Sequence, residues 1–267
     1  MPTRITSRQN PIVNRYRAVA KGHVDGMMLL DGVHLLQDAL AAGIEIEHAA
    51  IDVGAAERSD ISRLAAQLHA QRVETVTATA PVMGAMSPVH SPTGIVAIGR
   101  RPNRDVGDFY QGSAPLVVIA NDIQDPGNLG AIVRVAEAGG ASSVLAAGAS
   151  ADPFGWKALR GSMGSALRLP VDRVGDLAAA LTEAKSRGCR IIATVPRGGR
   201  SMYEMNFNGR HAVLIGGEGP GLPETLIASA DERLTIPMER GVESLNAATT
   251  TAVIVFEARR QRHVSVS

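Results

Sequence analysis

The sequence predicts an α/β protein in which a small N-terminal α/β domain precedes a larger domain with a mostly parallel sheet. Short apolar strands alternate with amphipathic helices along most of the 267 residues. In the second half, apolar strands also end in loops rich in Gly, Pro, Asn and Ser, which is where α/β folds bind ligands. A break in this alternation at residues 100–114 separates the two expected domains.

Residues 1–99 are expected to form the first domain. A helix is expected over 58–71, because Leu64, Ala65 and Leu68 share one face at helical spacing. The other expected helices are 11–21, 33–43 with a glycine at its end, and a short one around Gly84. The expected strands are 27–30, 45–52, 73–77 and 94–99.

Residues 100–114 are the expected linker, because RRPNRDVGDFYQGSA has three arginines, a proline, two glycines and no periodicity. Arg100, Arg101 and Arg104 are either solvated linker residues or contacts to a nucleic acid, and the pattern favours neither.

Residues 115–267 are the expected second domain, in which strands joined by helices imply a mostly parallel sheet covered on both faces. The expected strands are 115–120, 142–148, a short one ending at residue 171, 189–195, 211–216 and 234–237. The expected helices are 128–140, one that begins the segment 154–171, 176–187 and the closing helix 244–262.

Composition excludes several classes of function. The seven histidines are scattered and Cys189 is the single cysteine, so neither metal chemistry nor a disulfide framework is supported. Cys189 lies in the apolar run CRIIATV, which favours a buried structural thiol and a reducing compartment such as the cytoplasm. No apolar run approaches the ~20 residues of a membrane span. A net charge of +1 means that any basic nucleic-acid footprint must be local.

The first 24 residues contain five basic side chains and no acid. They are either a transit peptide, which leaves import into an organelle open, or a basic first helix of the folded domain. We prefer the helix, because no cleavage-like break separates this stretch from the residues after it.

The loop IGGEGPGLP after strand 211–216 is the clearest ligand-binding candidate. It resembles a dinucleotide fingerprint, with Glu239 at the spacing of a ribose-binding acid. However, Leu222 stands where the third glycine belongs, and the chain after the loop is too short for the rest of a Rossmann half. A phosphate-binding P-loop is excluded because no Gly-Lys-Ser/Thr comes after it.

The loop after strand 115–120 is the second polar cluster. Asp125-Pro126-Gly127 predicts a turn, and Asn128 is the expected N-cap of the next helix. Arg134 lies on that helix among apolar residues, either as a solvated surface residue or as a placed cation.

Three motifs in these loops carry a family resemblance. The run Asn121-x-x-x-Asp125-Pro126-x-Asn128-x-Gly130-x-x-x-Arg134, continuing to glycines 139 and 140, is similar to the first signature of the SpoU (TrmH-like) RNA ribose 2′-O-methyltransferases of the SPOUT superfamily. Gly217-Glu218-Gly219-x-Gly221-Leu222 resembles the second, and Ile236-Pro237-Met238 through Ser244-Leu245-Asn246 the third. With SMGSALRLPV (162–171), the similarity covers residues 115–262, and residues 1–99 resemble the ribosomal-protein-like substrate-binding domain of many members.

The resemblance implies a deep C-terminal trefoil knot that holds S-adenosylmethionine, and a homodimer with the site at its interface. It assigns cofactor contacts to Gly216, Gly217, Thr194, Ile236, Met238 and Leu245.

The same resemblance places Arg134 beside the ribose 2′-hydroxyl. A guanidinium stays protonated far above neutral pH and is therefore a poor base. We expect Arg134 to bind a phosphate or to stabilise the developing alkoxide, and Glu218 to accept the proton. Asn128, Ser244 and Asn246 would then orient Arg134 and the ribose.

The chain departs from the family after Asn246, where Ala247-Ala248-Thr249-Thr250 replaces the usual Val-Ser-Val-Ala, so the packing of the closing helix and of the dimer is open. The expected substrate is ribosomal RNA, with transfer RNA as a less favoured alternative, bound by the basic first helix. A rival interpretation is a non-catalytic RNA-binding or ribosome-assembly protein on the same fold.

Overall fold

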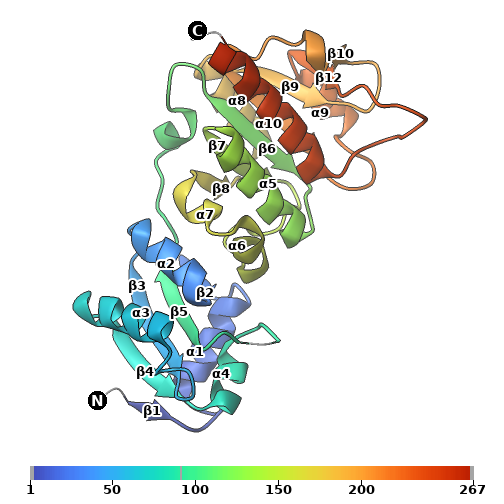
Figure 1. The fold of residues 1–267 in the computed structure, drawn as a ribbon. Coiled ribbons are helices and arrows are strands. Elements are labelled where there is room, and N and C mark those ends of the chain that lie inside the picture. The colour runs from blue at the N-terminus through green and yellow to red at the C-terminus, as the bar shows by residue number, and fades with distance from the viewer. Residues whose placement is uncertain (1–2, 91, 265–267) are drawn as a thin grey trace. The chain divides into compact units, whose positions relative to one another are not determined.

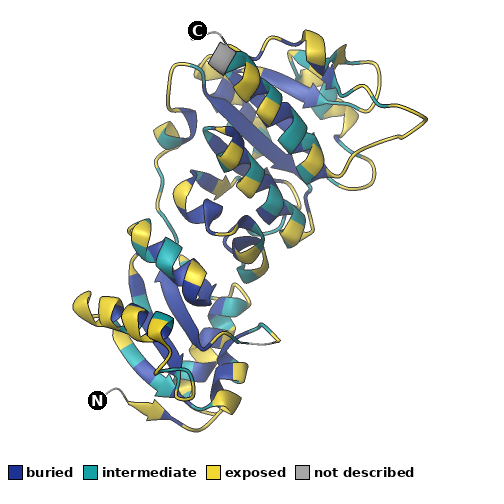
Figure 2. Ribbon diagram, viewed as in Figure 1, coloured by how far each residue is buried: buried dark blue, intermediate teal, exposed yellow. Residues whose placement is uncertain are grey.

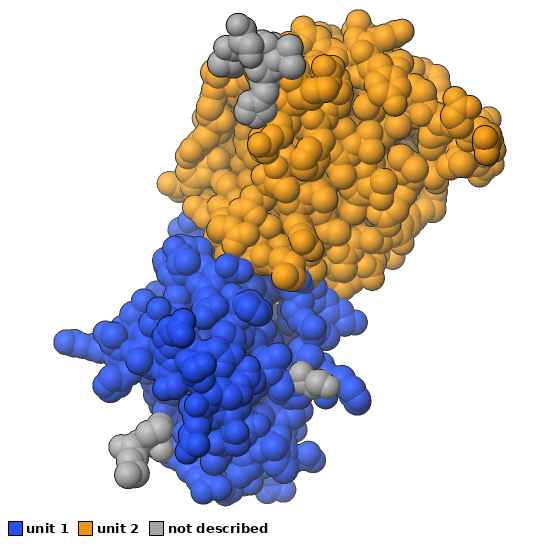
Figure 3. Space-filling view, in the orientation of Figure 1, with its two compact units in different colours: residues 1–103, 154–160 blue, residues 104–153, 161–267 orange. Residues whose placement is uncertain are grey.

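The computed structural model describes residues 3–90 and 92–264. The chain forms two compact units (Figure 3). The first comprises the described residues up to Asn103 together with Phe154–Arg160, and the second comprises Arg104–Pro153 and the described residues from Gly161 onward. The apolar pattern gives no sign that 154–160 belongs with the first unit.

The first unit is a layered α/β domain around a five-stranded sheet of order β1-β4-β3-β5-β2 (Figure 1). Its strands are β1 (Arg4–Ile5), β2 (Met27–Asp31), β3 (Ile46–Asp52), β4 (Glu74–Ala78) and β5 (Ile95–Arg100). Its helices are α1 (Pro11–Ala20), α2 (Val33–Ala41), α3 (Ser59–Ala70) and α4 (Ala80–Met86). Strand β5 is antiparallel to both neighbours, whereas β1, β3 and β4 run parallel. The two-residue β1 is too short for a periodic signal and was not predicted.

The core under α1 contains a buried polar pair. Tyr16 is fully buried and its hydroxyl lies 2.8 Å from Nδ1 of His48, which is itself 3% exposed. Burial lowers the pKa of His48 below its ordinary value and raises that of Tyr16. Among the described residues, Nε2 of His48 has no hydrogen-bond partner. This histidine is therefore held neutral inside the unit.

The expected linker is partly structured. A 3-10 helix, Val106–Tyr110, buries Phe109 and Tyr110 in the core of the second unit. Arg100 forms ion pairs with Glu45 and Glu47. Arg101 donates to the carbonyl of Met27 and lies over the Phe154 ring. Arg100 and Arg101 therefore both make contacts within the protein.

The second unit is built on a seven-stranded sheet of order β10-β12-β9-β11-β6-β7-β8, in which every pair is parallel. The strands are β6 (Leu116–Asn121), β7 (Ser143–Ala147), β8 (Val171–Arg173), β9 (Arg190–Thr194), β10 (Arg200–Ser201), β11 (His211–Gly216) and β12 (Glu232–Thr235). Strands β6 and β7 are buried along their whole length and β11 as far as Ile215 (Figure 2), as their continuous apolar composition predicts. The predicted mostly parallel α/β fold is confirmed.

Helices cover both faces of this sheet (Figure 1). On one face, α5 (Pro126–Gly139) and α10 (Ala247–Val264) pack against each other, and on the other lie α8 (Leu177–Ser186) and α9 (Glu224–Ser229). The short helices α6 (Trp156–Ser162) and α7 (Ser165–Arg168) occupy the predicted glycine-interrupted segment. No described helix is long and apolar enough to cross a membrane.

Helix α5 begins earlier than the sequence indicated. The N-cap is Asp125, whose Oδ1 accepts from the backbone N–H of Asn128 at 2.8 Å. Pro126 takes the first helical position, where its missing N–H costs nothing. The prediction of Asn128 as N-cap is therefore wrong, and its side chain is free for other contacts. The helix ends as predicted at Gly140, with φ of 81°.

Helix α10 packs on α5 at a glycine. Gly139 is buried, and a Cβ there would collide with the Val255 side chain of α10. Thr251 is fully buried, and its hydroxyl donates to the carbonyl of Ala247 at 2.8 Å. The departure from the family pattern at 247–250 is thus accommodated within a regular helix.

We expect Gly139→Ser to lower the free energy of unfolding by ~1–3 kcal/mol, because the added atoms overpack the α5–α10 contact. The neighbouring Ala138→Ser, at an exposed position, is the matched control and should change little. Urea denaturation of both variants measures the difference. Equal stabilities would contradict this packing.

The free energy of unfolding should fall as the pH drops from about 7.5 to about 5.5, because His48 binds its proton at a higher pH in the unfolded chain. His48→Gln should reduce this fall, and the exposed His69→Gln is the control. Denaturation at both pH values tests the prediction. An identical pH dependence in wild type and His48→Gln would refute it.

Candidate functional site

A cavity of about 390 Å³ lies at the carboxyl ends of the parallel strands in the second unit. Thr194 and Gly216 end β9 and β11, and Ile236 directly follows β12. Because these strands are parallel neighbours, their ends and the loops after them converge at one edge. The cavity is lined by all six predicted cofactor contacts, Thr194, Gly216, Gly217, Ile236, Met238 and Leu245.

Two glycines allow the chain segments at this edge to touch. A Cβ at Gly216 would lie 2.7 Å from backbone atoms of Gly221 and Leu222. A Cβ at Gly217 would collide with the carbonyl of Asp122, in the loop after β6. Both are closer than real Cβ contacts, and the obstacles are backbone atoms that cannot turn aside. The close approach therefore requires glycine at both positions.

Thr194 contributes less to a ligand than its position suggests. Its hydroxyl donates to the carbonyl of Leu214 at 2.8 Å, so its proton is already used within the sheet. Only an acceptor lone pair remains for a bound molecule.

A chain of hydrogen bonds joins the first turn of α5, the glycine loop and the residue before α10 beside the cavity. The Asn246 amide donates to Oδ1 of Asn128 at 3.2 Å, and the Asn128 amide donates to Oε1 of Glu218. Asn246 and Glu218 also line the cavity. The cluster thus combines one residue from α5, one from the glycine loop and one from the start of α10.

The direction in which these hydrogen bonds donate is set by Asn246, which caps the N-terminus of α10. Oδ1 of Asn246 accepts from the backbone N–H groups of Ala248 and Thr249, at 2.8 and 3.4 Å, as an N-cap does. Its NH₂ group must therefore point outward to Asn128. Asn128 then presents its own NH₂ group to the carboxylate, which is an acceptor when ionised. The second oxygen of Glu218 is the remaining acceptor for a substrate hydroxyl.

Ser244 and Arg134 stand apart from this hydrogen-bonded cluster. Ser244 lines the cavity from the loop between β12 and α10. Arg134 is exposed on α5 and is not among the residues that line the cavity. Within one chain, Asn128 bonds to both Asn246 and Glu218. No hydrogen bond in the described residues links Arg134 to Asn128, Ser244 or Asn246, the three residues that were expected to orient it.

Sequence reasoning missed several lining residues, including Leu222, Val195, Pro196 and Thr250. Val195 and Pro196 directly follow β9, so the rule that ligands bind beyond strand ends would have found them. Thr250 lies one turn into α10, and it lines the cavity only because of where that helix packs on the sheet. No group of three or more His, Cys, Asp or Glu side chains in the described ranges is arranged to hold a metal ion.

Comparison with solved structures gives matches along nearly the whole chain. The SpoU methyltransferase AviRb from Streptomyces viridochromogenes, in complex with AdoMet, has a TM-score of 0.88 at 26% identity and covers 96% of this chain and 99% of that one. An AdoMet-bound rRNA methyltransferase from Sinorhizobium meliloti has a TM-score of 0.86 at 28% identity and covers 97% of each chain.

Sequence comparisons point the same way. A tRNA/rRNA methyltransferase of Synechocystis, itself uncharacterized, is 34% identical over 97% of this chain and 94% of its own length. A 23S rRNA guanosine 2′-O-methyltransferase of Bacillus subtilis is 27% identical over 86% of this chain and 88% of its own length. The SpoU rRNA methylase family model matches residues 115–256. This span holds the cavity and the Asn128–Glu218–Asn246 cluster, and the chain belongs to the SpoU rRNA methylase family.

Proposed function

We propose that this protein transfers the methyl group of S-adenosylmethionine to a ribose 2′-hydroxyl of ribosomal RNA. The observation that carries the proposal is the Asn246–Asn128–Glu218 chain, which places an oriented carboxylate at the mouth of the cavity. The names of the relatives and the AdoMet-bound structural matches support both the cofactor and the kind of RNA.

The cavity suits S-adenosylmethionine by its chemistry. Apolar side chains of Ile236, Leu245 and Leu222 would hold the adenine ring. Backbone groups at Gly216 and Gly217 are accessible because these residues carry no side chain. When bound, S-adenosylmethionine supplies an electrophilic methyl group.

Glu218 removes the proton from the ribose hydroxyl in this proposal. Asn128 holds Oε1, and Oε2 accepts the proton directly or through a water molecule. Ser244, on the loop that also lines the cavity, orients the ribose. Such alignment alone can supply several kcal/mol of rate enhancement, up to ~7–11 for well-placed partners.

Arg134 binds a phosphate of the RNA or stabilises the alkoxide that forms on the ribose oxygen. We further propose that it does so in a homodimer whose sites lie at the interface. Arg134 shares the outer face of α5 and α10 with half-buried or exposed apolar residues, of which Phe256 is 48% exposed. The others on this face are Ala131, Val135, Ala252 and Val253. A second copy would cover these side chains and bring Arg134 to the interface.

The trefoil knot is also part of the proposal. We infer that the carboxyl-edge segments, from β11 to the start of α10, form the knot of the family. The backbone contact of Gly217 with Asp122, which joins segments far apart in the sequence, is a close crossing of the kind that such a knot needs.

We propose that the first unit binds the RNA through basic residues at its N-terminal end. Several of these residues are already engaged within the unit. Arg15 forms an ion pair with Glu47, and Arg8 and Arg17 donate to the carbonyls of Pro81 and Ala85. These bonds each use part of a guanidinium, and the exposed remainder can contact phosphates. The buried thiol of Cys189 is compatible with the cytoplasmic location that we propose.

Glu218→Gln is expected to lower kcat by ~10²–10⁴, because the amide cannot accept the proton. Cofactor affinity should stay near the wild-type value, since the change is isosteric. Transfer of labelled methyl groups to unmodified ribosomal RNA transcripts measures turnover, and calorimetry measures S-adenosylmethionine binding. Glu57→Gln, at an exposed position, is the control. Normal turnover of Glu218→Gln would remove Glu218 from the proton transfer.

Arg134→Ala should retain cofactor binding and lose ~10²–10³ in turnover, with partial recovery in Arg134→Lys. The exposed Arg63→Ala is the matched control. The same two assays apply, together with a measurement of molecular mass by light scattering. If Arg134→Ala bound cofactor and kept near-normal turnover, its assigned role would be wrong. If the wild-type chain transferred no methyl group to any RNA, the proposed methyltransferase activity would be contradicted.

A further inference from the structure

Tyr203 is an exposed aromatic residue that has no role in the proposed methyl transfer. Its side chain is 68% exposed, whereas the other two tyrosines, Tyr16 and Tyr110, are buried. It lies in the turn after β10, and the chain contains only eight aromatic residues in total, from one Trp, three Tyr and four Phe. An isolated exposed tyrosine on a regular surface needs no explanation. Tyr203 differs from such a residue in its position on the sheet and in the charged residues near it.

The strand register places Tyr203 at the same edge of the sheet as the cavity. Ser201 of β10 pairs with Thr235 of β12, and the residue after Thr235, Ile236, lines the cavity. The two strands are parallel, so the residues after Ser201 run level with those after Thr235. Tyr203 is therefore at the rim on the β10 side.

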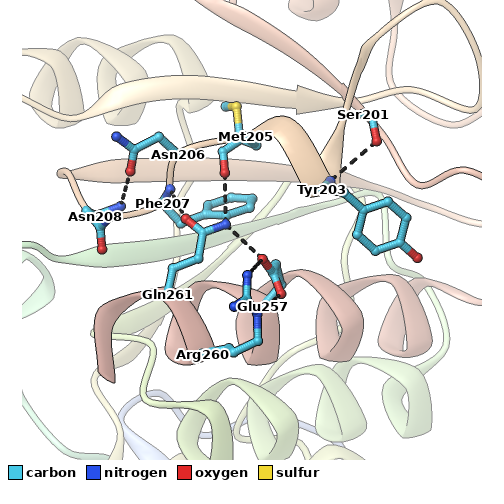
Figure 4. Close-up of polar contacts among 9 residues, drawn as sticks. All are labelled: Ser201, Tyr203, Met205, Asn206, Phe207, Asn208, Glu257, Arg260 and Gln261. Atoms are coloured by element: carbon cyan, nitrogen blue, oxygen red, sulfur yellow. Dashed lines mark hydrogen bonds and ion pairs between the residues drawn. The ribbon is translucent and has the colours of Figure 1, made fainter. Parts of the chain in front are cut away.

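The turn that carries Tyr203 is anchored on both sides. Before it, the backbone N–H of Gly199 donates to Oγ1 of Thr235, and Ser201 Oγ accepts from the N–H of Tyr203. After it, Gln261 of α10 donates to the carbonyl of Met205 at 2.9 Å and accepts from the N–H of Phe207 at 2.8 Å. Figure 4 shows the Tyr203 ring extending away from this Gln261 cluster. The aromatic ring is thus carried by a turn whose two ends are held by hydrogen bonds.

Charged residues surround this position with a net positive balance. Arg197 and Arg200 are both exposed, and Arg197 directly follows the cavity-lining Pro196. Arg200 lies 3.6 Å from Glu232, which also pairs with Arg190 at 2.6 Å. Glu204, next to Tyr203, is exposed and opposes them in part. An exposed aromatic ring with arginines close by in the sequence is the combination that single-stranded RNA contacts use.

We propose that Tyr203 is a stacking platform for an unpaired base of the RNA substrate, with Arg197 and Arg200 contacting the adjacent phosphates. This inference rests on the proposed function. Strands β12 and β9 separate β10 from β11, which Glu218 follows, so three strand spacings of ~4.8 Å, roughly 14 Å in all, lie between them. The stacked base is therefore a neighbour of the methylated nucleotide. Tyr203 contributes to RNA affinity and takes no part in the methyl transfer.

The test compares Tyr203→Ala with Tyr203→Phe, which keeps the ring and removes the hydroxyl. The substrate is the unmodified RNA to which the wild-type chain transfers methyl groups. Tyr203→Ala should weaken RNA binding about tenfold or more, which is ~1.4 kcal/mol of stacking, and raise KM for RNA while leaving single-turnover methyl transfer at saturating RNA unchanged. Tyr203→Phe should restore wild-type affinity. Crosslinking of 4-thiouridine-containing RNA to the 197–204 segment in wild type would support the contact.

Controls separate this result from other causes. S-adenosylmethionine affinity and melting temperature should be unchanged in both variants, and Val106→Ala controls for loss of another exposed apolar side chain. Wild-type RNA affinity in Tyr203→Ala would overturn the inference while leaving the methyltransferase proposal intact. A fall in molecular mass with unchanged RNA affinity would also overturn it, because Tyr203 would then contact a second copy. If the wild-type chain methylated no RNA, both proposals would fail.

Discussion

The N-terminal cap of α10 is the interaction on which the candidate site depends. Asn246 must turn its oxygen toward the backbone of Ala248 and Thr249 to begin the helix. That requirement leaves its NH₂ group for Asn128, and Asn128 in turn leaves its own NH₂ group for Glu218. A structural need of one helix thereby sets the orientation of two amides and one carboxylate. The orientation of these three side chains therefore follows from the N-cap of α10.

The cavity next to this cluster depends on backbone proximity. Gly217 lies against the carbonyl of Asp122, and Gly216 against the backbone of Gly221 and Leu222, so any side chain would push these segments apart. Seven parallel strands bring the segments to one edge, because all their carboxyl ends point the same way. The sheet thus gathers the loops, and the glycines let them close around a ligand.

The surface of the protein shows why charge alone does not identify an RNA contact. In the sequence, Arg100 and Arg101 fit a solvated linker and a nucleic-acid contact equally well. In the structure, Arg100 is paired with two glutamates, and Arg101 packs on Phe154 and donates to a backbone carbonyl. By contrast, Arg134 and Tyr203 lie within largely apolar or mixed stretches and are exposed in the fold. Of the residues that we assign to RNA, Arg134 and Tyr203 are therefore exposed, whereas Arg8, Arg15 and Arg17 are partly engaged within the first unit.

The sequence by itself determined most elements of secondary structure and the parallel sheet, and the six residues that it assigned to the cofactor all line the cavity. These depend on local periodicity and on loops that come directly after apolar strands, which are short-range signals. Short β1 and β10 and the association of 154–160 with the first unit were missed, because they depend on partners distant in the sequence.

Only the tertiary structure decided what the polar residues of the site do. The pattern suggested Asn128 as a helix cap, but Asp125 takes that role. Asn128 instead bonds residues 90 and 118 positions away in the chain. No local rule links such positions, because a side-chain hydrogen bond depends on the packing that brings its partners within reach. The sequence therefore indicated many of the residues that line the cavity, and the fold decided which of them bond to one another and left Arg134 outside the lining.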